Sequence, residues 1–129
     1  MRKVSIEIAK AFINDKKKTV GNTYTENGEI FLHNNKIAWW ENNHPSENLS
    51  NNIHLCFSMC GWGTVTTRER LNTLFYELFN GERVYLQQVT GNQYIYINNN
   101  GIEIDPSKVY ILREIENDLF LDEPVALAI

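Results

Sequence analysis

Apolar residues recur at every second position in one stretch of the chain, which predicts a half-buried strand. They alternate with polar or small residues from Ile53 to Met59, and Gly61 ends the run. A period of two is that of a strand with one face on a core. Later runs are separated by turn residues at Gly91-Asn92 and Asn100-Gly101. The strands predicted in this second half lie at 83–89, 94–98, 102–104 and 108–115.

The segment 29–40 predicts a hairpin, because the pair Asn34-Asn35 tolerates the positive φ of a two-residue turn. A turn at this pair sets Leu32 opposite Ile37 and places both on the core face. Alternation then distributes the other side chains. The core face also receives Ile30 and Trp39, and the opposite face receives Phe31, His33 and Trp40.

The N-terminal segment 4–13 has a mixed pattern. It starts with a strand period from Val4 to Ile8 and loses that period near Lys10. We expect a strand with a bulge, and a short helix is the alternative.

The two ends of the chain carry opposite charge. Residues 1–18 contain six basic and two acidic residues, whereas residues 103–129 contain two basic and seven acidic ones. Residues 116–129 form an acidic and apolar tail. The apolar end of this tail, 125–129, is expected either to close the sheet or to contact a partner.

Residues 66–81 carry the signature of an amphipathic helix. Thr66 and Glu69 have the spacing of a capping box, and Gly81 stands where a helix would end. The helix and the strands together predict an α+β fold, an antiparallel and largely meander β-sheet with one amphipathic helix packed on it. The apolar stripe of this helix consists of Leu71, Leu74, Phe75, Leu78 and Phe79.

The composition fits one globular domain over residues 1–129. The chain is 43% hydrophobic and 22% charged. It has no apolar run near the roughly 20 residues of a membrane span, and its first residues lack the apolar stretch of a signal peptide. Its two cysteines, four positions apart, do not make a secreted disulfide framework. We therefore expect a cytoplasmic protein with reduced thiols.

Two arginines lie at the start of the predicted helix, where the helix dipole disfavours a cation. On a helical wheel with Leu71 at zero, Arg68 lies at about 60° and Asn72 at about 100°, whereas Arg70 lies at about 260°. The apolar stripe centres at about 10°. Arg68 is therefore expected to lean toward the core, and Arg70 is expected to be solvated.

Two interpretations of Arg68 remain open. In the first, its guanidinium joins free backbone N–H groups and the hydroxyls of Thr64, Thr66 and Thr67 in an anion site at the helix N-terminus. In the second, it forms an internal ion pair with Glu41 or Asp105 and holds the helix against the sheet.

The aromatic residues suggest further contact surfaces. Trp62 lies between glycines and is expected in the core or at its rim, with a stacking platform as the alternative. Tyr85, Tyr94 and Tyr96 fall on the face of the meander opposite its core. That row resembles a stacking surface for single-stranded nucleic acid, but few basic residues accompany it, so a packed layer or a protein contact is preferred. The net charge of −4 argues against duplex nucleic acid.

Catalytic and metal-binding patterns are weak. His54, Cys56 and Cys60 project from one strand face, but their spacing is not that of a zinc knuckle. The chain has neither a phosphate-binding glycine loop nor a nucleophile elbow. We predict no catalytic residue, no metal and no cofactor. A nucleotide-processing enzyme with His33 or His54 as general base is the least favoured alternative.

Two motifs resemble those of small phage and prophage proteins of uncharacterised function. One is the hairpin segment 32–38, with Asn35 where those proteins tend to have glycine, and the other is the helix-start segment 61–72. The resemblance covers roughly residues 19–110. It implies a protein made during infection that acts on host machinery in the bacterial cytoplasm, and it implies no particular activity.

These observations favour a non-enzymatic binding protein of counter-defence, which blocks a host immune component such as a CRISPR effector by occupancy. The alternatives are a protein that sequesters a phosphate-bearing nucleotide signal at the helix N-terminus and a weak binder of single-stranded nucleic acid. A homodimer is also plausible. The predicted contact residues are His33, Trp40, Trp62, Thr64, Thr66, Thr67, Arg68, Arg70, Asn72, Tyr94 and Tyr96.

Overall fold

The computed structural model describes residues 2–42, 44–45 and 52–123. Within these ranges the chain forms two helices and ten strands in two antiparallel sheets, which confirms the predicted α+β class. The elements are α1 (Lys3–Ile13), β1 (Lys18–Val20), β2 (Thr23–Glu26), β3 (Glu29–Leu32), β4 (Asn35–Trp40), β5 (Ile53–Ser58), α2 (Val65–Leu78), β6 (Val84–Val89), β7 (Asn92–Ile97), β8 (Asn100–Ile104), β9 (Val109–Ile115) and β10 (Asp118–Asp122).

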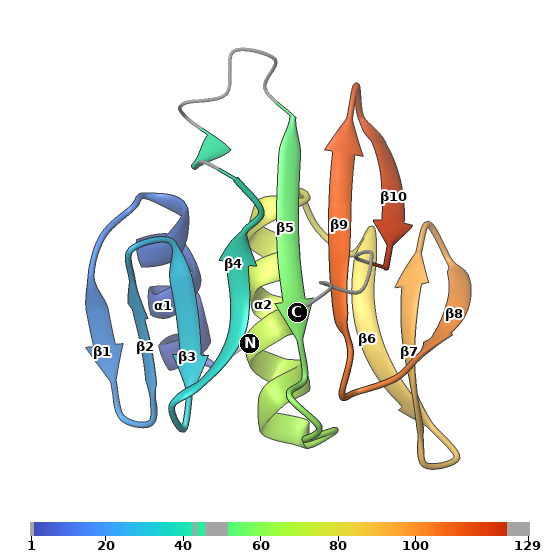
Figure 1. Cartoon of the computed structure of the whole chain (residues 1–129), viewed down its shortest axis with the longest axis horizontal. Coiled ribbons are helices and arrows are strands. Elements are labelled where there is room, and N and C mark those ends of the chain that lie inside the picture. The colour runs from blue at the N-terminus through green and yellow to red at the C-terminus, as the bar shows by residue number, and fades with distance from the viewer. Residues whose placement is uncertain (1, 43, 46–51, 124–129) are drawn as a thin grey trace, which may run out of the picture.

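The larger sheet is a meander interrupted once. Its seven strands lie in the order β1-β2-β3-β4-β5-β9-β10, and every neighbouring pair is antiparallel. The interruption falls between β5 and β9, where the chain forms α2 and the three-stranded sheet β6-β7-β8. Both helices cover the same face of the seven-stranded sheet, and the small sheet lies beyond its β9-β10 end (Figure 1).

The N-terminal segment forms α1, so the expectation of a bulged strand was wrong. Ile8, Ala9 and Phe12 are buried on one side of this helix, which is the i, i+1, i+4 spacing of a helical face. The strand-like alternation at its start contains only three apolar residues, too few to decide between the two periods. The helix packs against α2 and against β1 to β3.

The hairpin of β3 and β4 turns one residue earlier than predicted. His33 and Asn34 adopt φ values of +50° and +65°, so they are the turn residues and Leu32 pairs with Asn35. The register then shifts between Ile30 and Phe31, and Ile37 is the additional residue of a bulge. Such a bulge changes which residues face the core.

The bulge reverses the predicted positions of the two tryptophans. Trp40 is buried and stacks on Phe12 of α1, with ring centroids 4.4 Å apart. Trp39 instead faces outward, half-buried, with the ammonium of Lys36 4.6 Å from its ring centroid. Trp40 therefore belongs to the core, and its prediction as a contact residue was wrong.

Helix α2 confirms the predicted stripe, and its cap differs from the prediction. Thr64 is the N-cap, and its hydroxyl oxygen accepts the N–H of Thr67 at 3.2 Å. Glu69 does not complete a capping box with Thr66, because its carboxylate accepts hydrogen bonds from the Ser5 and Thr73 hydroxyls. The stripe is buried at Leu71, Leu74, Phe75 and Phe79 and half-buried at Leu78.

The small sheet has the predicted strands, with the first turn one residue earlier than predicted and the second turn two residues earlier. The turns are Thr90-Gly91 and Asn98-Asn99, all four residues with positive φ. The predicted faces are confirmed, with one exception on the core side. Val84, Leu86, Ile95, Ile97 and Ile104 are buried on the core face, whereas Ile102 is 44% exposed at the sheet edge.

Strand β9 confirms the strand predicted at 108–115, and β10 pairs with it as an edge strand. Residues 125–129, for which closing the sheet or contacting a partner was predicted, lie outside the described residues.

Candidate functional site

A groove of about 550 Å³ lies between the β3-β4 turn and the start of α2. The sequence segments that meet there are separated by more than twenty residues, and they are the same two segments that carry the phage-type motifs. The groove is lined by Leu32, His33, Asn35, Ile37, Met59, Cys60, Trp62, Thr64, Thr66 and Thr67. Five of the predicted contact residues are therefore brought together.

Trp62 stands at the rim of the groove with 62% of its surface exposed. A tight connection between β5 and α2 places it there, because Cys60 and Gly61 have φ values of +54° and +81°. The backbone is fixed on both sides of the indole. Trp62 N–H donates to the Met59 carbonyl, and its own carbonyl accepts from Thr64, both at 2.8 Å. The expectation of a place in the core or at its rim was therefore wrong.

The groove has an apolar floor and an uncharged polar rim. Leu32, Ile37 and Met59 are buried beneath it. At the rim, Nε2 of His33 lies 3.3 Å from the side-chain nitrogen of Asn22. No lining residue is an acid, lysine or arginine. An uncharged, partly apolar group fits such a lining better than a phosphate does.

The three threonines of the groove lining differ in whether their hydroxyls are already engaged within the protein. The hydroxyls of Thr64 and Thr67 lie 3.0 Å apart, and the Thr64 hydroxyl already caps the helix. Thr66 is half-buried and lies in the groove lining. The Cys60 thiol, also in the lining, donates to the Lys36 carbonyl at 3.0 Å, and burial raises its pKa. A protonated thiol is a weak nucleophile, so this position does not suggest covalent chemistry.

Arg68 leans inward as predicted, but its partners are neutral. Its Nη1 donates to the Gly63 carbonyl at 2.9 Å and to the amide oxygens of Gln88 and Gln93 at 3.0 and 3.1 Å. The predicted pairing with Glu41 or Asp105 was therefore wrong. A Cβ added to Gly63 would lie 2.8 Å from the Gln93 amide nitrogen, so the glycine is required for this contact. Arg68 joins the start of α2 to the small sheet and does not line the groove.

Arg70 is the buried arginine, and its prediction as a solvated residue was wrong. It is 8% exposed and donates to the hydroxyls of Ser5 and Thr23 at 2.8 and 3.0 Å. Burial lowers its pKa from the ordinary value, while Glu69 opposes that effect. The helix side that it occupies is covered by α1, which the sequence pattern did not predict.

Asn72 closes the inner edge of the small sheet. Its side-chain nitrogen donates to the Leu86 carbonyl at 2.9 Å, and its side-chain oxygen accepts the Leu86 N–H at 2.6 Å. The amide thus takes the place of a neighbouring strand beside β6. We therefore assign it a structural contact in place of the predicted ligand contact.

The tyrosine row is present on the outer face of the small sheet. The rings of Tyr85 and Tyr96 stack with centroids 5.0 Å apart, and Tyr94 lies 6.4 Å from Tyr96. All three are half-buried. The hydroxyl of Tyr94 lies 3.4 Å from a Glu103 oxygen, and this carboxylate raises the Tyr94 pKa. A carboxylate beside the row is unfavourable for a nucleic-acid backbone.

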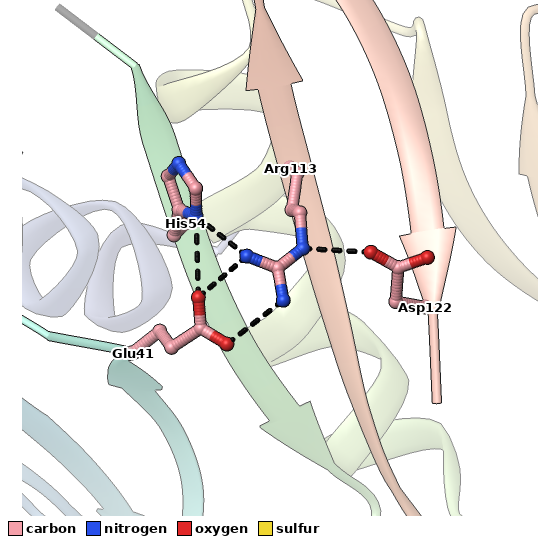
Figure 2. Close-up of polar contacts among 4 residues, drawn as sticks. All are labelled: Glu41, His54, Arg113 and Asp122. Carbon is pink, nitrogen blue, oxygen red and sulfur yellow. Dashed lines mark hydrogen bonds and ion pairs between the residues drawn. The ribbon is translucent and has the colours of Figure 1, made fainter. Parts of the chain in front are cut away.

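A polar cluster that the sequence did not single out lies on the open face of the large sheet (Figure 2). Arg113 of β9 donates to both carboxylate oxygens of Glu41 at 2.6 and 3.0 Å and to Asp122 of β10 at 2.7 Å. Its Nη1 also lies 2.7 Å from Nδ1 of His54 on β5. The pairing of His54 with Arg113 depends on β5 lying beside β9, which no local pattern reveals.

The contacts of this cluster favour a structural role, in which they hold neighbouring strands together, over a catalytic one. Nδ1 of His54 lies 2.7 Å from Nη1 of Arg113 and 3.2 Å from Oε1 of Glu41, so this ring nitrogen is already engaged within the cluster. The neighbouring Cys56 is buried, and burial together with Glu41 raises the pKa of its thiol to about 11. Among the described residues, no three histidine, cysteine or acidic side chains are arranged to hold a metal ion.

Comparison with known protein families identifies the family to which the chain belongs. A family model described as Kyanoviridae Gp96 protein matches residues 1–111. The chain belongs to the Kyanoviridae Gp96 protein family. Membership of this phage family confirms the phage origin that the two motifs implied. No curated protein and no solved structure matches the chain.

The match to the Kyanoviridae Gp96 family covers the groove and the small sheet, whereas Arg113 and Asp122 of the polar cluster lie beyond it. The groove and the tyrosine row therefore lie wholly within the family segment, and the polar cluster does not. No helix in the described part of the chain is both long and apolar enough to cross a membrane.

Proposed function

We propose that this protein of the Kyanoviridae Gp96 family is a non-enzymatic binding protein, which binds a host protein through the groove beside Trp62 and blocks it by occupancy. The observation that carries the proposal is the exposure of Trp62, 62%, at the rim of an uncharged groove with an apolar floor. Exposed indoles of this kind carry a large share of the energy in protein interfaces. Val65, also at the start of α2, is 65% exposed and extends the apolar surface.

The expected partner presents an uncharged side chain to the groove. Leu32, Ile37 and Met59 offer apolar contact, while His33 and Thr66 offer hydrogen bonds at the rim. Because the family is one of phages, we place this partner in the infected cell and propose counter-defence by occupancy of an immune component, such as a CRISPR effector.

The contacts of Arg68 weaken the nucleotide alternative. A phosphate site at the helix start needs a cation, and the guanidinium is engaged by three neutral oxygens away from the groove. We therefore favour a protein partner over a nucleotide signal.

The test compares three chains as bait in lysate of the phage's host, namely the unchanged protein, Trp62→Ala and Phe120→Ala. Phe120 is a matched control, because it is an aromatic residue 48% exposed on β10, outside the groove lining. We expect one host protein to bind the unchanged chain and Phe120→Ala, and to be lost with Trp62→Ala. Retention by Trp62→Ala, or a nucleotide that raises the melting temperature of both the unchanged protein and Trp62→Ala, would contradict the proposal.

A further inference from the structure

The two sheets have four edge strands, and three of them are protected among the described residues. The edge strand β1 is three residues long and begins at Lys18, after two more lysines. The edge strand β10 has an aspartate at each end, Asp118 and Asp122. The inner edge of β6 is closed by the amide of Asn72. Short length, charge and a side-chain cover are the usual defences of edge strands.

The fourth edge, β8, is less protected than the other three. Four of its five residues are exposed, and no described strand pairs with its outer side. It carries a single charge, Glu103, and an isoleucine, Ile102, that is 44% exposed. An exposed edge with a single charge and an exposed isoleucine is a template for pairing with another strand.

The β7-β8 turn determines which backbone groups of β8 point outward. Asn98 and Asn99 form a two-residue turn, so Ile97 and Asn100 are the closing pair and share hydrogen bonds. Hydrogen-bonded pairs then alternate along the ladder. The N–H and C=O groups of Gly101 and Glu103 therefore face away from β7 and are available.

We infer that a second copy of this chain pairs antiparallel with β8, with Ile102 on the two-fold axis. In this register Gly101 of each copy lies opposite Glu103 of the other, and each such pair exchanges both of its outward backbone hydrogen bonds. Ile102 of one copy meets Ile102 of the other in the non-hydrogen-bonded pair, where side chains are closest. The small sheets of the two copies then form one continuous sheet.

The strand is complementary to itself under this symmetry. The only charged residue, Glu103, faces a glycine, so no like charges lie directly opposite each other. The same operation on β10 about Phe120 would set Asp118 opposite Asp122, which is repulsive. Charge thus favours self-pairing at β8 and disfavours it at β10.

Side chains on both faces of β8 are compatible with this contact between the β8 strands of the two copies. The ring of Tyr96 lies across Gly101, where an added Cβ would be 2.9 Å from a ring carbon. This cover keeps the tyrosine face continuous up to the edge of β8. On the core face, the partner's strand covers Ile102 and removes an exposed apolar side chain from water. One strand from each copy gives a small interface, so we expect a reversible dimer in the micromolar range.

Sedimentation equilibrium across a range of protein concentrations tests the dimer. The average mass of the unchanged protein should rise from 15.0 kDa toward twice that value. Ile102→Lys sets two ammonium groups opposite each other and should raise the dissociation constant by at least about tenfold. Phe120→Lys places the same change on the protected edge strand β10 and should leave dimerisation unchanged. An unchanged protein that stays at 15.0 kDa, or an Ile102→Lys variant that dimerises normally, overturns the inference.

Amide hydrogen exchange on the unchanged protein provides a measurement that needs no variant. The amides of Gly101 and Glu103 should exchange freely in dilute solution and slowly in concentrated solution. The β9-β10 turn, by the same alternation, points the amides of Leu119 and Leu121 outward on β10. These control amides should exchange at the same rate at both concentrations. Protection at Leu119 and Leu121 with none at Gly101 and Glu103 would refute the assignment to β8.

Discussion

Replacing Asn72 with alanine removes a side-chain amide that makes two hydrogen bonds to the backbone of one buried strand residue. Leu86 is 3% exposed, and both its N–H and its carbonyl bond to this amide, at 2.6 and 2.9 Å. After the substitution neither group has its partner. The edge of β6 faces α2 at this point, so water reaches the two groups poorly.

The size of the effect follows from the cost of unsatisfied buried groups. Each unpaired backbone donor or acceptor costs about 1–3 kcal/mol, and partial access of water places these two at the lower end. We therefore expect Asn72→Ala to lose about 2–4 kcal/mol of the free energy of unfolding. This loss is a large part of the free energy of unfolding of a folded domain, which is typically about 5–15 kcal/mol. Asn72→Asp keeps an acceptor for the Leu86 N–H but sets a carboxylate against the Leu86 carbonyl, so it should not restore stability.

Urea denaturation followed by circular dichroism measures this loss. The midpoint should fall for both variants while the slope stays the same, since the amount of surface exposed on unfolding is unchanged. Tyr76→Ala serves as control, because Tyr76 is 41% exposed and lies one turn further along α2. Its denaturation midpoint should be close to that of the unchanged protein. If Asn72→Ala keeps its stability and instead loses a bound partner, then Asn72 is a contact residue and our structural assignment is wrong.

Three further predictions use the same denaturation assay. Arg70→Ala should lower the free energy of unfolding by about 3 kcal/mol, because two buried hydroxyls and Glu69 lose their cation. Arg70→Met refills the volume and should lower it less. Equal stability of Arg70→Ala and the unchanged protein would contradict the buried network. Phe12→Ala should cost about 3–5 kcal/mol through the cavity left under Trp40, and a loss below about 1 kcal/mol would show that α1 does not pack there. The Cys56 thiol has a pKa raised from 9.0 to about 11 in the folded chain, so its contribution to stability is complete below pH 9 and is lost as the pH rises toward 11. Cys56→Ala should reduce this alkaline loss, and an unchanged alkaline profile would contradict the shift.

The strands and the helix α2 were predictable because each has a full period of its own pattern. The stripe from Leu71 to Phe79 covers two helical turns, and the alternation from Ile53 to Met59 covers a whole strand. The turns were each placed late, the first two by one residue and the turn at Asn98-Asn99 by two. In this chain His33, Thr90 and Asn98 take the first positive-φ position of a turn, where the preference of turns for asparagine and glycine points one or two residues further along.

The largest errors at the candidate site have a common cause, which is the missing helix α1. Without it, the side of α2 that carries Arg70 looks solvent-exposed, and the partner of Trp40 is absent. Glu69 likewise has no hydroxyl of Ser5 to accept from, so its spacing from Thr66 suggests a capping box. The segment Lys3–Ile13 has apolar residues at seven of its eleven positions, and their spacing fits a strand at its start and a helix toward its end, so the pattern does not exclude a strand.

Polar residues with strong hydrogen-bonding demand are unreliable guides to a binding surface in this fold. Arg68, Arg70 and Asn72 were predicted as contact residues at the start of the helix, and each finds hydrogen-bond partners inside the protein. Together they fix α2 to the small sheet, to α1 and to β2. The large apolar residues that stay exposed at the start of α2 are then Trp62 and Val65, whose surface is left uncovered by the described chain. The same helix start that the polar side chains hold rigidly thus presents an ordered apolar rim, and a rim that is already ordered loses little entropy when a partner binds.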